Sequence, residues 1–281
     1  MQLTRLTSRP RIITLMLAVI RYPLLDTVSG LVHAVTTRFG GTSQAPFASL
    51  NLGLHVGDDP QRVLANRALV LKALGFGPGQ LVLAAQVHGS QVAQVGAADA
   101  GRGSSDGATA LPGADALITA TPGLLLGVLV ADCAPILLAD PVSGAIGVAH
   151  AGWRGTAGDV AGNSVRAMVA AFGTRPDDLR ALIGPSIGPA DFEVGPEVTA
   201  AFRAALVGPD AAGIVRPGQG DRATVDLPEA NRLLLLRAGL DPRRIQVDKA
   251  STAAQVDRFF SHRAEAGRTG RFGGFIGWPA S

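Results

Sequence analysis

Residues 124–156 read LLLGVLVADCAPILLADPVSGAIGVAHAGWRGT. The stretch holds three apolar runs of strand length, and a polar turn over residues 140–144 separates the last two, as in buried strands joined by a hairpin. The first run leads into Asp132 and Cys133, and the last leads into His150. Two expected strands therefore end in potential soft-metal ligands, where loops can expose them.

On both sides of this stretch, apolar runs alternate with helix signals. Asp59 is suited to cap a helix that begins at Pro60 and stops at Gly75, and residues 96–113 predict a mobile surface loop. The alternation predicts an α/β (α+β) fold, a single layered domain with mixed β-sheets flanked by helices. Strands are expected at 31–37, 81–85, 115–119, 124–131, 135–139, 145–149, 179–183, 244–248 and 272–276, and further helices at 159–172, 196–206 and 228–238.

The ends of the chain and its composition define the domain. Residues 1–22 resemble a signal peptide superficially, but the apolar run at 12–20 is too short to span a bilayer and no small-residue cleavage site follows. We therefore expect an N-terminal extension at 1–22 and one catalytic domain at 23–281. A single cysteine in 281 residues favours a reducing compartment, so the expected location is cytoplasmic.

The charge pattern and composition disfavour nucleic acids and membranes as partners. The net charge is only +3, the basic residues are scattered, and aromatic residues make up 5% of the chain. This composition disfavours nucleic-acid binding, and no membrane segment is expected. A small anionic substrate would need only a few of the arginines. The sequence leaves the oligomeric state open.

His88, Cys133 and His150 are the main candidates for chemistry, because each follows an apolar run. Two nitrogens and one sulfur suit a zinc ion and leave a fourth position open for water or substrate, as in catalytic zinc sites. A rival reading makes Cys133 a nucleophile that His150 activates and Asp132 or another carboxylate orients. A third reading is a buried thiol acting as a small hydrophobe, which the neighbouring Asp132 weakens.

The remaining polar candidates have simpler readings. His33 is expected to be structural. For His55 and His262, contact with a ligand and simple surface exposure are equally expected. Arg154 precedes a helix and could hold phosphate, although a tight turn is the favoured reading. Substrate-side groups could also include Arg38, Asn51, Asn66 and Arg67, of which the last two lie on the helix after Pro60, where a solvated face is the default.

A set of motifs in a fixed order resembles the YfiH-like family, over residues 23 to the C-terminus. That family carries the names laccase-domain protein and polyphenol oxidase, and later purine nucleoside phosphorylase with adenosine deaminase activity. The motifs are TRFGGTS at 37–43, SLNLGLHVGD at 49–58, NR at 66–67, QVHG at 86–89, ADCAP at 131–135, HAGWRG at 150–155, GPSIGP at 184–189 and FFSHR at 259–263.

The resemblance implies a zinc site at His88, Cys133 and His150. From the residues themselves we count Asp132 among the catalytic residues, as a carboxylate that could orient a ligand histidine. It implies phosphorolysis of adenosine, inosine and methylthioadenosine to a base and a sugar 1-phosphate, with deamination of adenosine as a side activity. Purine nucleosides and phosphate would be the partners. The expected substrate-binding residues are Arg38, Asn51, Arg67 and Arg154. Editing of peptidoglycan precursors is a lesser expectation from the same family.

The chain also departs from the family pattern. Many members carry cysteines where this chain has Ala190-Asp191, Ser251-Thr252 and Ala254. Their absence leaves Cys133 as the single thiol, which disfavours a multi-copper cluster. One thiolate and two histidines could still hold a single copper ion, so a copper-dependent phenol oxidase stays open beside the zinc enzyme.

Overall fold

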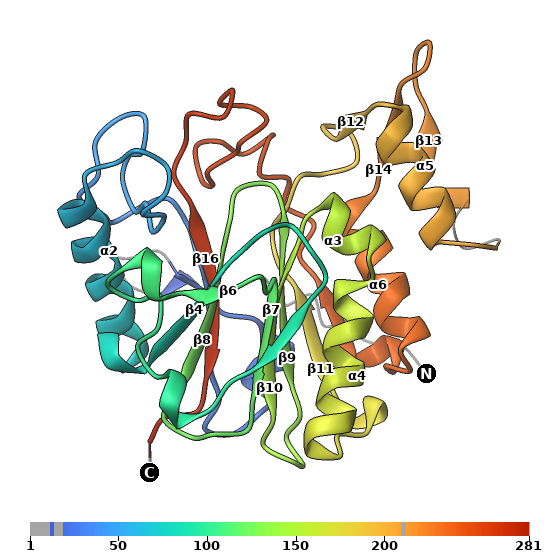
Figure 1. The fold of residues 1–281 in the computed structure, drawn as a ribbon. Helices are drawn as coiled ribbons and strands as arrows, with labels where there is room; N and C mark the ends of the chain where they lie inside the picture. The colour runs from blue at the N-terminus through green and yellow to red at the C-terminus, as the bar shows by residue number, and fades with distance from the viewer. Residues whose placement is uncertain (1–11, 14–18, 209–211, 281) are drawn as a thin grey trace, which may run out of the picture.

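A computed structural model describes residues 12–13, 19–208 and 212–280 and shows two large β-sheets packed face to face (Figure 1). The first sheet has seven strands, and β4 runs parallel to both of its neighbours while the other pairs are antiparallel. In spatial order its strands are β1 (Ile12–Ile13), β2 (Val19–Ile20), β3 (Val32–Thr36), β16 (Phe272–Gly277), β8 (Leu125–Val130), β4 (Leu81–Ala85) and β6 (Leu111–Pro112).

The second sheet has six strands and is also mixed, with parallel pairs at both edges. Its order is β15 (Ile245–Val247), β11 (Arg180–Ile183), β9 (Ala134–Ala139), β10 (Ile146–Ala151), β7 (Ala116–Thr119) and β5 (Val92–Gln94). A separate three-stranded sheet contains β12 (Glu193–Val194), β14 (Ala223–Val225) and β13 (Val215–Pro217).

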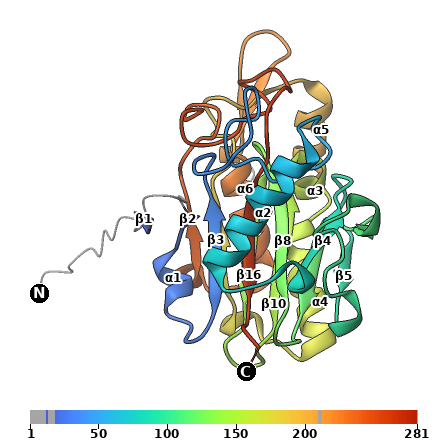
Figure 2. The same ribbon diagram turned by 90° about the vertical axis from the view of Figure 1, so that its left-hand side faces the viewer.

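Helices cover the outer faces of the two large sheets, so the molecule has four layers. Helix α2 (Pro60–Leu74) packs on the seven-stranded sheet (Figure 2), and α4 (Val160–Phe172) and α6 (Leu227–Arg237) pack on the six-stranded sheet. The central core lies between the sheets and includes Val128 of β8 and Leu137 of β9. Strands buried on both faces need apolar residues at successive positions, which explains the continuous apolar runs of 124–151.

The remaining helical segments are short. They are α1 (Pro23–Asp26), α3 (Trp153–Ala157), α5 (Pro196–Ala205) and the 3₁₀ turns η1 (Pro78–Gln80), η2 (Ala97–Asp99), η3 (Gly107–Thr109), η4 (Pro176–Asp178) and η6 (Pro242–Arg244). Among the described residues, none of the helices has the length and apolar character needed to cross a membrane.

The expected elements are confirmed to within a few residues at their ends. Asp59 caps α2 by accepting a hydrogen bond from the amide of Gln61, and Gly75 ends the helix at a φ of 78°. Asp159 caps α4 in the same way through the amide of Gly162. The layered arrangement of mixed sheets and flanking helices is the predicted α/β (α+β) class.

Two regions differ from expectation. Segment 96–113 contains η2, η3 and the strand β6, and Arg67 donates hydrogen bonds to the carbonyls of Gly103 and Ser104, so the predicted loop is tied to α2. Strand β2, which falls within the predicted extension at 1–22, pairs with β3 and contributes to the core. The predicted signal-like features at residues 1–11 and 14–18 lie outside the described residues.

Candidate metal centre

The candidate site lies where the chain crosses from one large sheet to the other. Because β4 and β8 are parallel, they end at the same edge of the seven-stranded sheet. After β8 the chain passes through Asp132 and Cys133 into β9, and after β4 it passes through His88 into β5. His150 lies on β10 opposite Pro135, beside the start of β9. Sheet order therefore brings together three residues that are far apart in the sequence.

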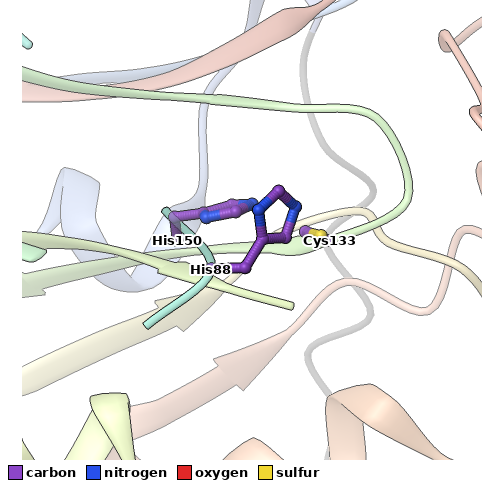
Figure 3. A group of neighbouring side chains, drawn as sticks. All are labelled: His88, Cys133 and His150. Atoms are coloured by element: carbon purple, nitrogen blue, oxygen red, sulfur yellow. The ribbon is translucent and has the colours of Figure 1, made fainter. Parts of the chain in front are cut away.

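The ligand atoms of His88, Cys133 and His150 all lie within 4.8 Å of one another (Figure 3). The two imidazole rings meet edge to face, with centroids 4.8 Å apart. His150 is buried, Cys133 is half-buried and His88 is exposed, so the cluster is open on the His88 side. Gly152 leaves the space for this approach, because a Cβ there would lie 2.8 Å from the sulfur of Cys133.

Two residues of the crossings have left-handed backbone conformations. The φ angles are 61° at His88 and 85° at Asp132, a region that non-glycine residues rarely adopt. Such conformations carry a cost of order 1–3 kcal/mol and are concentrated at functional sites. Here they turn the chain sharply at the two points where ligand side chains must face each other.

Asp115 organises both histidines. Its Oδ1 lies 2.8 Å from Nδ1 of buried His150 and accepts a hydrogen bond from the backbone amide of His88. Its Oδ2 accepts hydrogen bonds from the amides of Val87 and Gly89. The carboxylate therefore fixes the His150 ring with Nε2 as its remaining ligand atom, and it also holds the turn that carries His88.

Asp115 was not among the residues predicted from the sequence, although the signal was present. This aspartate is a polar residue immediately before the apolar strand β7, and it is fully buried. A buried carboxylate needs partners, but which partners it finds depends on the order of strands in the sheet.

The charges of the cluster are coupled. Burial acts to raise the pKa of the Cys133 thiol, but the charge of His150 and hydrogen bonds from both histidines outweigh it and lower the pKa to about 6. Burial acts to lower the pKa of His150, but the interactions with Cys133 and Asp115 raise it to about 9. Without a metal ion, Cys133 and His150 therefore form a thiolate–imidazolium pair at neutral pH.

The donor set fits a metal ion. Two imidazole nitrogens and a thiolate converge, a carboxylate orients one of the rings, and the exposed side leaves access for a further ligand. A metal ion would displace the proton of His150. The positive charge of the ion would then balance the negative charge of the Cys133 thiolate, which the proton balances when no metal is bound. The predicted cluster of three ligand residues is thus brought together, with Asp115 as their support.

The role expected for Asp132 is corrected. Its carboxylate accepts hydrogen bonds from the hydroxyls of Thr252 and Ser261 at 2.7 Å and from the amide of Arg263 at 2.6 Å. No hydrogen bond to a histidine is found for it among the described residues. Asp132 therefore fastens the 252–263 segment to the Cys133 turn, and Asp115 takes the orienting role that was assigned to Asp132.

Arg38 and Asn51 are engaged within the protein. Arg38 lies over the ring of Phe260, pairs with Glu265 and donates to the carbonyl of Ala48. Asn51 is fully buried, and its Oδ1 accepts hydrogen bonds from the amides of Gly53 and Arg271. Both side chains stabilise the loops around the cluster. Because their polar groups are already bonded within the protein, they have little freedom to bind a substrate.

The other expected substrate residues fall in different environments. Arg67 is buried, so the expected solvated helix face is wrong here, and its guanidinium donates to the carbonyls of Leu52, Gly103 and Ser104. Asn66 is also buried and donates to the carbonyl of Asn51. Arg154 lies on the short helix α3 and not in the tight turn that was favoured from the sequence, and its side chain is 59% exposed and stacks on Trp153.

The other histidines behave as follows. His33 is buried and accepts a hydrogen bond from the amide of Tyr22, so its expected structural role is confirmed. His55 and His262 are both exposed. At two of the positions where the family resemblance led us to expect cysteines, the Ser251 hydroxyl donates a hydrogen bond to the carboxylate of Asp191.

Sequence comparisons agree with the motifs. A family model described as multi-copper polyphenol oxidoreductase laccase matches residues 32–279. A protein of Geobacillus stearothermophilus named purine nucleoside phosphorylase YlmD is 43% identical over 249 residues, covering 89% of this chain and 90% of that protein. A protein of Deinococcus radiodurans named purine nucleoside phosphorylase is 44% identical over 247 residues, covering 88% of this chain and 89% of that protein.

Solved structures show the same fold. The crystal structure of YlmD from Geobacillus stearothermophilus superposes with a TM-score of 0.89 at 41% identity, covering 93% of this chain and 96% of that one. The crystal structure of the hypothetical protein YfiH from Bacillus licheniformis gives a TM-score of 0.90 at 35% identity, covering 95% and 98%. The fold class expected from the sequence is confirmed by both.

Proposed function

The chain belongs to the laccase-like, YfiH-type family described as multi-copper polyphenol oxidoreductase laccase, and from that premise we propose that it is a zinc-dependent purine nucleoside phosphorylase. The observation that carries the proposal is that relatives named purine nucleoside phosphorylase match about nine-tenths of the chain at 43% and 44% identity. The cluster of His88, Cys133 and His150 supports it by offering a reactive centre. The substrates would be purine nucleosides and phosphate.

The proposed reaction cleaves the glycosidic bond with phosphate. An oxygen of phosphate forms a bond to C1′ of the sugar, the bond from C1′ to the purine nitrogen breaks, and the electron pair leaves with the base, which takes up a proton. The products are a free base and a sugar 1-phosphate. As a side activity we propose deamination, in which water adds at C6 of adenosine and ammonia leaves to give inosine.

His88, Cys133 and His150 would hold the metal ion, which when bound would act as a Lewis acid and could activate water. Asp115 holds the His150 ring in one orientation and fixes the turn of His88. Asp132 keeps the Cys133 turn in place through its three hydrogen bonds. The open side at His88 is where we place the nucleoside. The thiolate of Cys133 needs a reducing compartment, so we propose that the protein acts in the cytoplasm.

A copper-dependent phenol oxidase is the second candidate, favoured by the description of the family. The described part of the chain contains one group of three or more potential metal-ligating side chains, and Cys133 is the single cysteine of the sequence. That donor set suits one ion and gives no support to a cluster of several copper ions. We therefore place zinc first and a single copper ion second.

One experiment ranks these activities. Purified protein is incubated with adenosine and phosphate, and adenine, hypoxanthine, inosine and ribose 1-phosphate are followed together with the metal content. We expect ribose 1-phosphate to form only with phosphate present, and about one zinc per chain. Turnover of phenols with copper bound, and no ribose 1-phosphate, would favour the oxidase. Absence of any metal, with rapid alkylation of Cys133, would favour a Cys-His hydrolase.

A further inference from the structure

Phosphorolysis requires a site for a phosphate anion, and the four substrate residues expected from the sequence do not provide an evident one. The guanidinium groups of Arg38 and Arg67 are engaged by carbonyls of the protein, and Arg154 is largely exposed on α3. Another arginine, Arg271, has different surroundings and immediately precedes β16.

The sheet register places Arg271 beside the metal cluster. Phe272 pairs with Val130 in the antiparallel pair of β16 and β8, so Arg271 lies level with Ala131, next to the Asp132–Cys133 turn. Its backbone also joins the loop that leads to His55, because the amide of Arg271 donates to Asn51 and its carbonyl accepts from Leu52. The side chain packs closely on Gly53, where a Cβ would lie 2.8 Å from Cγ of Arg271.

The hydrogen bonds of Arg271 leave one edge of its guanidinium free. Nη1 donates to the carbonyls of Thr269 and Gly270, which fixes the side chain. Within the described residues, Nε and Nη2 make no hydrogen bond and no carboxylate forms an ion pair with the group. The pair Nε and Nη2 is the edge that binds two oxygens of a phosphate in a bidentate manner.

The electrostatic surroundings also favour an anion. Arg271 is half-buried, and burial lowers its pKa while the negative charges of Cys133 and Asp132 raise it. Burial lowers the pKa of nearby His55, and the charges of Arg271, Arg67 and the two cluster histidines lower it further. Several positive groups therefore lie in this region beside the negative Cys133 and Asp132, and burial of the Arg271 guanidinium without a hydrogen-bonded anion carries a cost that a ligand can relieve.

We propose that Arg271 binds the phosphate of the reaction through its Nε–Nη2 edge, next to the His88–Cys133–His150 cluster and facing the loop of His55. This assignment rests on the proposed phosphorolytic function. The sugar 1-phosphate product carries the same dianionic group and would occupy the same place. The position fits the reaction because phosphate and the metal-side nucleoside must meet at C1′ of the sugar.

The test compares Arg271→Gln and Arg271→Lys with the wild-type protein in two measurements. In steady-state kinetics, Arg271→Gln should raise the KM for inorganic phosphate by about 10- to 100-fold, because charged hydrogen bonds are lost. The KM for the nucleoside should change by less than about twofold, and Arg271→Lys should restore part of the loss since it keeps the charge without the fork. Arg268→Gln, an exposed arginine three residues earlier, is the matched control.

The second measurement does not require turnover. Inorganic phosphate added to metal-stripped wild-type protein should raise its Tm, and this shift should be lost in Arg271→Gln but kept in Arg268→Gln. An unchanged phosphate KM and an unchanged Tm shift would overturn the assignment. If Arg271→Gln changed only the metal content of the protein, Arg271 would serve only to balance the negative charges of Cys133 and Asp132. That result would also overturn the assignment. If the wild type forms no sugar 1-phosphate, the proposed function fails, and the Tm shift alone then decides the anion site.

Discussion

Asp115 and His150 form a fully buried pair in which a carboxylate oxygen lies 2.8 Å from Nδ1 of the imidazole, while the same carboxylate receives the backbone amides of the His88 turn. One side chain thus sets the positions of two of the three candidate metal ligands. The donors from the backbone and from His150 also lower the pKa of Asp115 despite its burial, so the carboxylate stays charged.

This relationship predicts that Asp115→Asn weakens the metal site without abolishing it. The amide keeps one oxygen acceptor but loses the negative charge and presents an NH₂ group to one of its present donors. We expect metal affinity to fall by about 10- to 100-fold, as for other residues that orient a ligand histidine. Competition with a chelator measures this affinity. Asp177→Asn, at an exposed position of η4, is the control, and equal affinities in the two variants would contradict the role of Asp115.

Removal of a ligand side chain is the more severe change. Cys133→Ala and His150→Ala should each lose the bound metal and the turnover of nucleosides, because a site of two ligands holds zinc poorly. Metal analysis and product formation are measured on the same preparations, with circular dichroism to show that each variant is folded. Phosphorolysis retained by metal-free Cys133→Ala protein would refute the proposed mechanism.

The pKa of Cys133 predicts how the metal-stripped protein reacts with alkylating agents. The thiol pKa is lowered to about 6, so the thiolate is present above that pH and is lost as the pH falls below it. The rate of reaction with iodoacetamide should reach half its maximum near pH 6. His150→Asn removes the cation and should move this midpoint upward by at least about one pH unit. A wild-type midpoint above pH 8 would show that the thiolate–imidazolium pair does not form.

His33 predicts a loss of stability in mild acid. Burial and the charge of Arg21 lower its pKa from 6.5 to about 4, and its Nδ1 has no hydrogen-bond partner within the described residues. Because the folded pKa is the lower one, the unfolded chain binds more protons between these values, and stability falls as the pH decreases from 6.5 to 4. The loss at pH 4 amounts to about 3 kcal/mol. Urea titrations of wild type and His33→Gln over this range measure it.

The glutamine can keep the acceptor for the amide of Tyr22 but does not titrate, so His33→Gln should show a flatter pH dependence. His262→Gln, at an exposed position, should behave like the wild type. Parallel curves for wild type and His33→Gln would assign the acid sensitivity to other groups.

The sequence predicted the central strands well and the supports of the site poorly, for physical reasons. Strands such as β9 and β10 are buried on both faces, so their apolar runs are visible locally, and the ligands His150 and Cys133 lie at or beside their ends. The buried partners of Arg67, in contrast, are loop carbonyls at positions 103 and 104. A helix pattern treats such an arginine as solvated, because nothing nearby in the sequence reveals the carbonyls that it meets.

The same limit explains Asp115 and Asp132. Both are carboxylates next to apolar strands, and Asp132 was the one predicted to orient a histidine because it adjoins Cys133. In the fold, the left-handed φ of Asp132 turns its side chain toward Thr252 and Ser261, whereas the pairing of β7 with β10 brings Asp115 to His150. Which aspartate meets the histidine is decided by strand order, a long-range property that adjacency in the sequence does not reveal.

Gly152 offers a test of the cluster geometry that leaves every ligand in place. Its φ of −77° suits alanine, so Gly152→Ala meets no backbone strain, but the new Cβ would lie 2.8 Å from the Cys133 sulfur and 3.3 Å from Cδ2 of His88. The sulfur and the ring must both move away from the new Cβ, so we expect metal affinity to fall by at least about tenfold, since ligand distances tolerate only small errors.

Gly107→Ala, where a Cβ meets nothing within 4 Å, is the matched control. Chelator competition and Tm are measured for both variants. If Gly152→Ala binds metal as tightly as Gly107→Ala at an unchanged Tm, the sulfur is not confined between Gly152 and the histidines, and the cluster is looser than its geometry indicates.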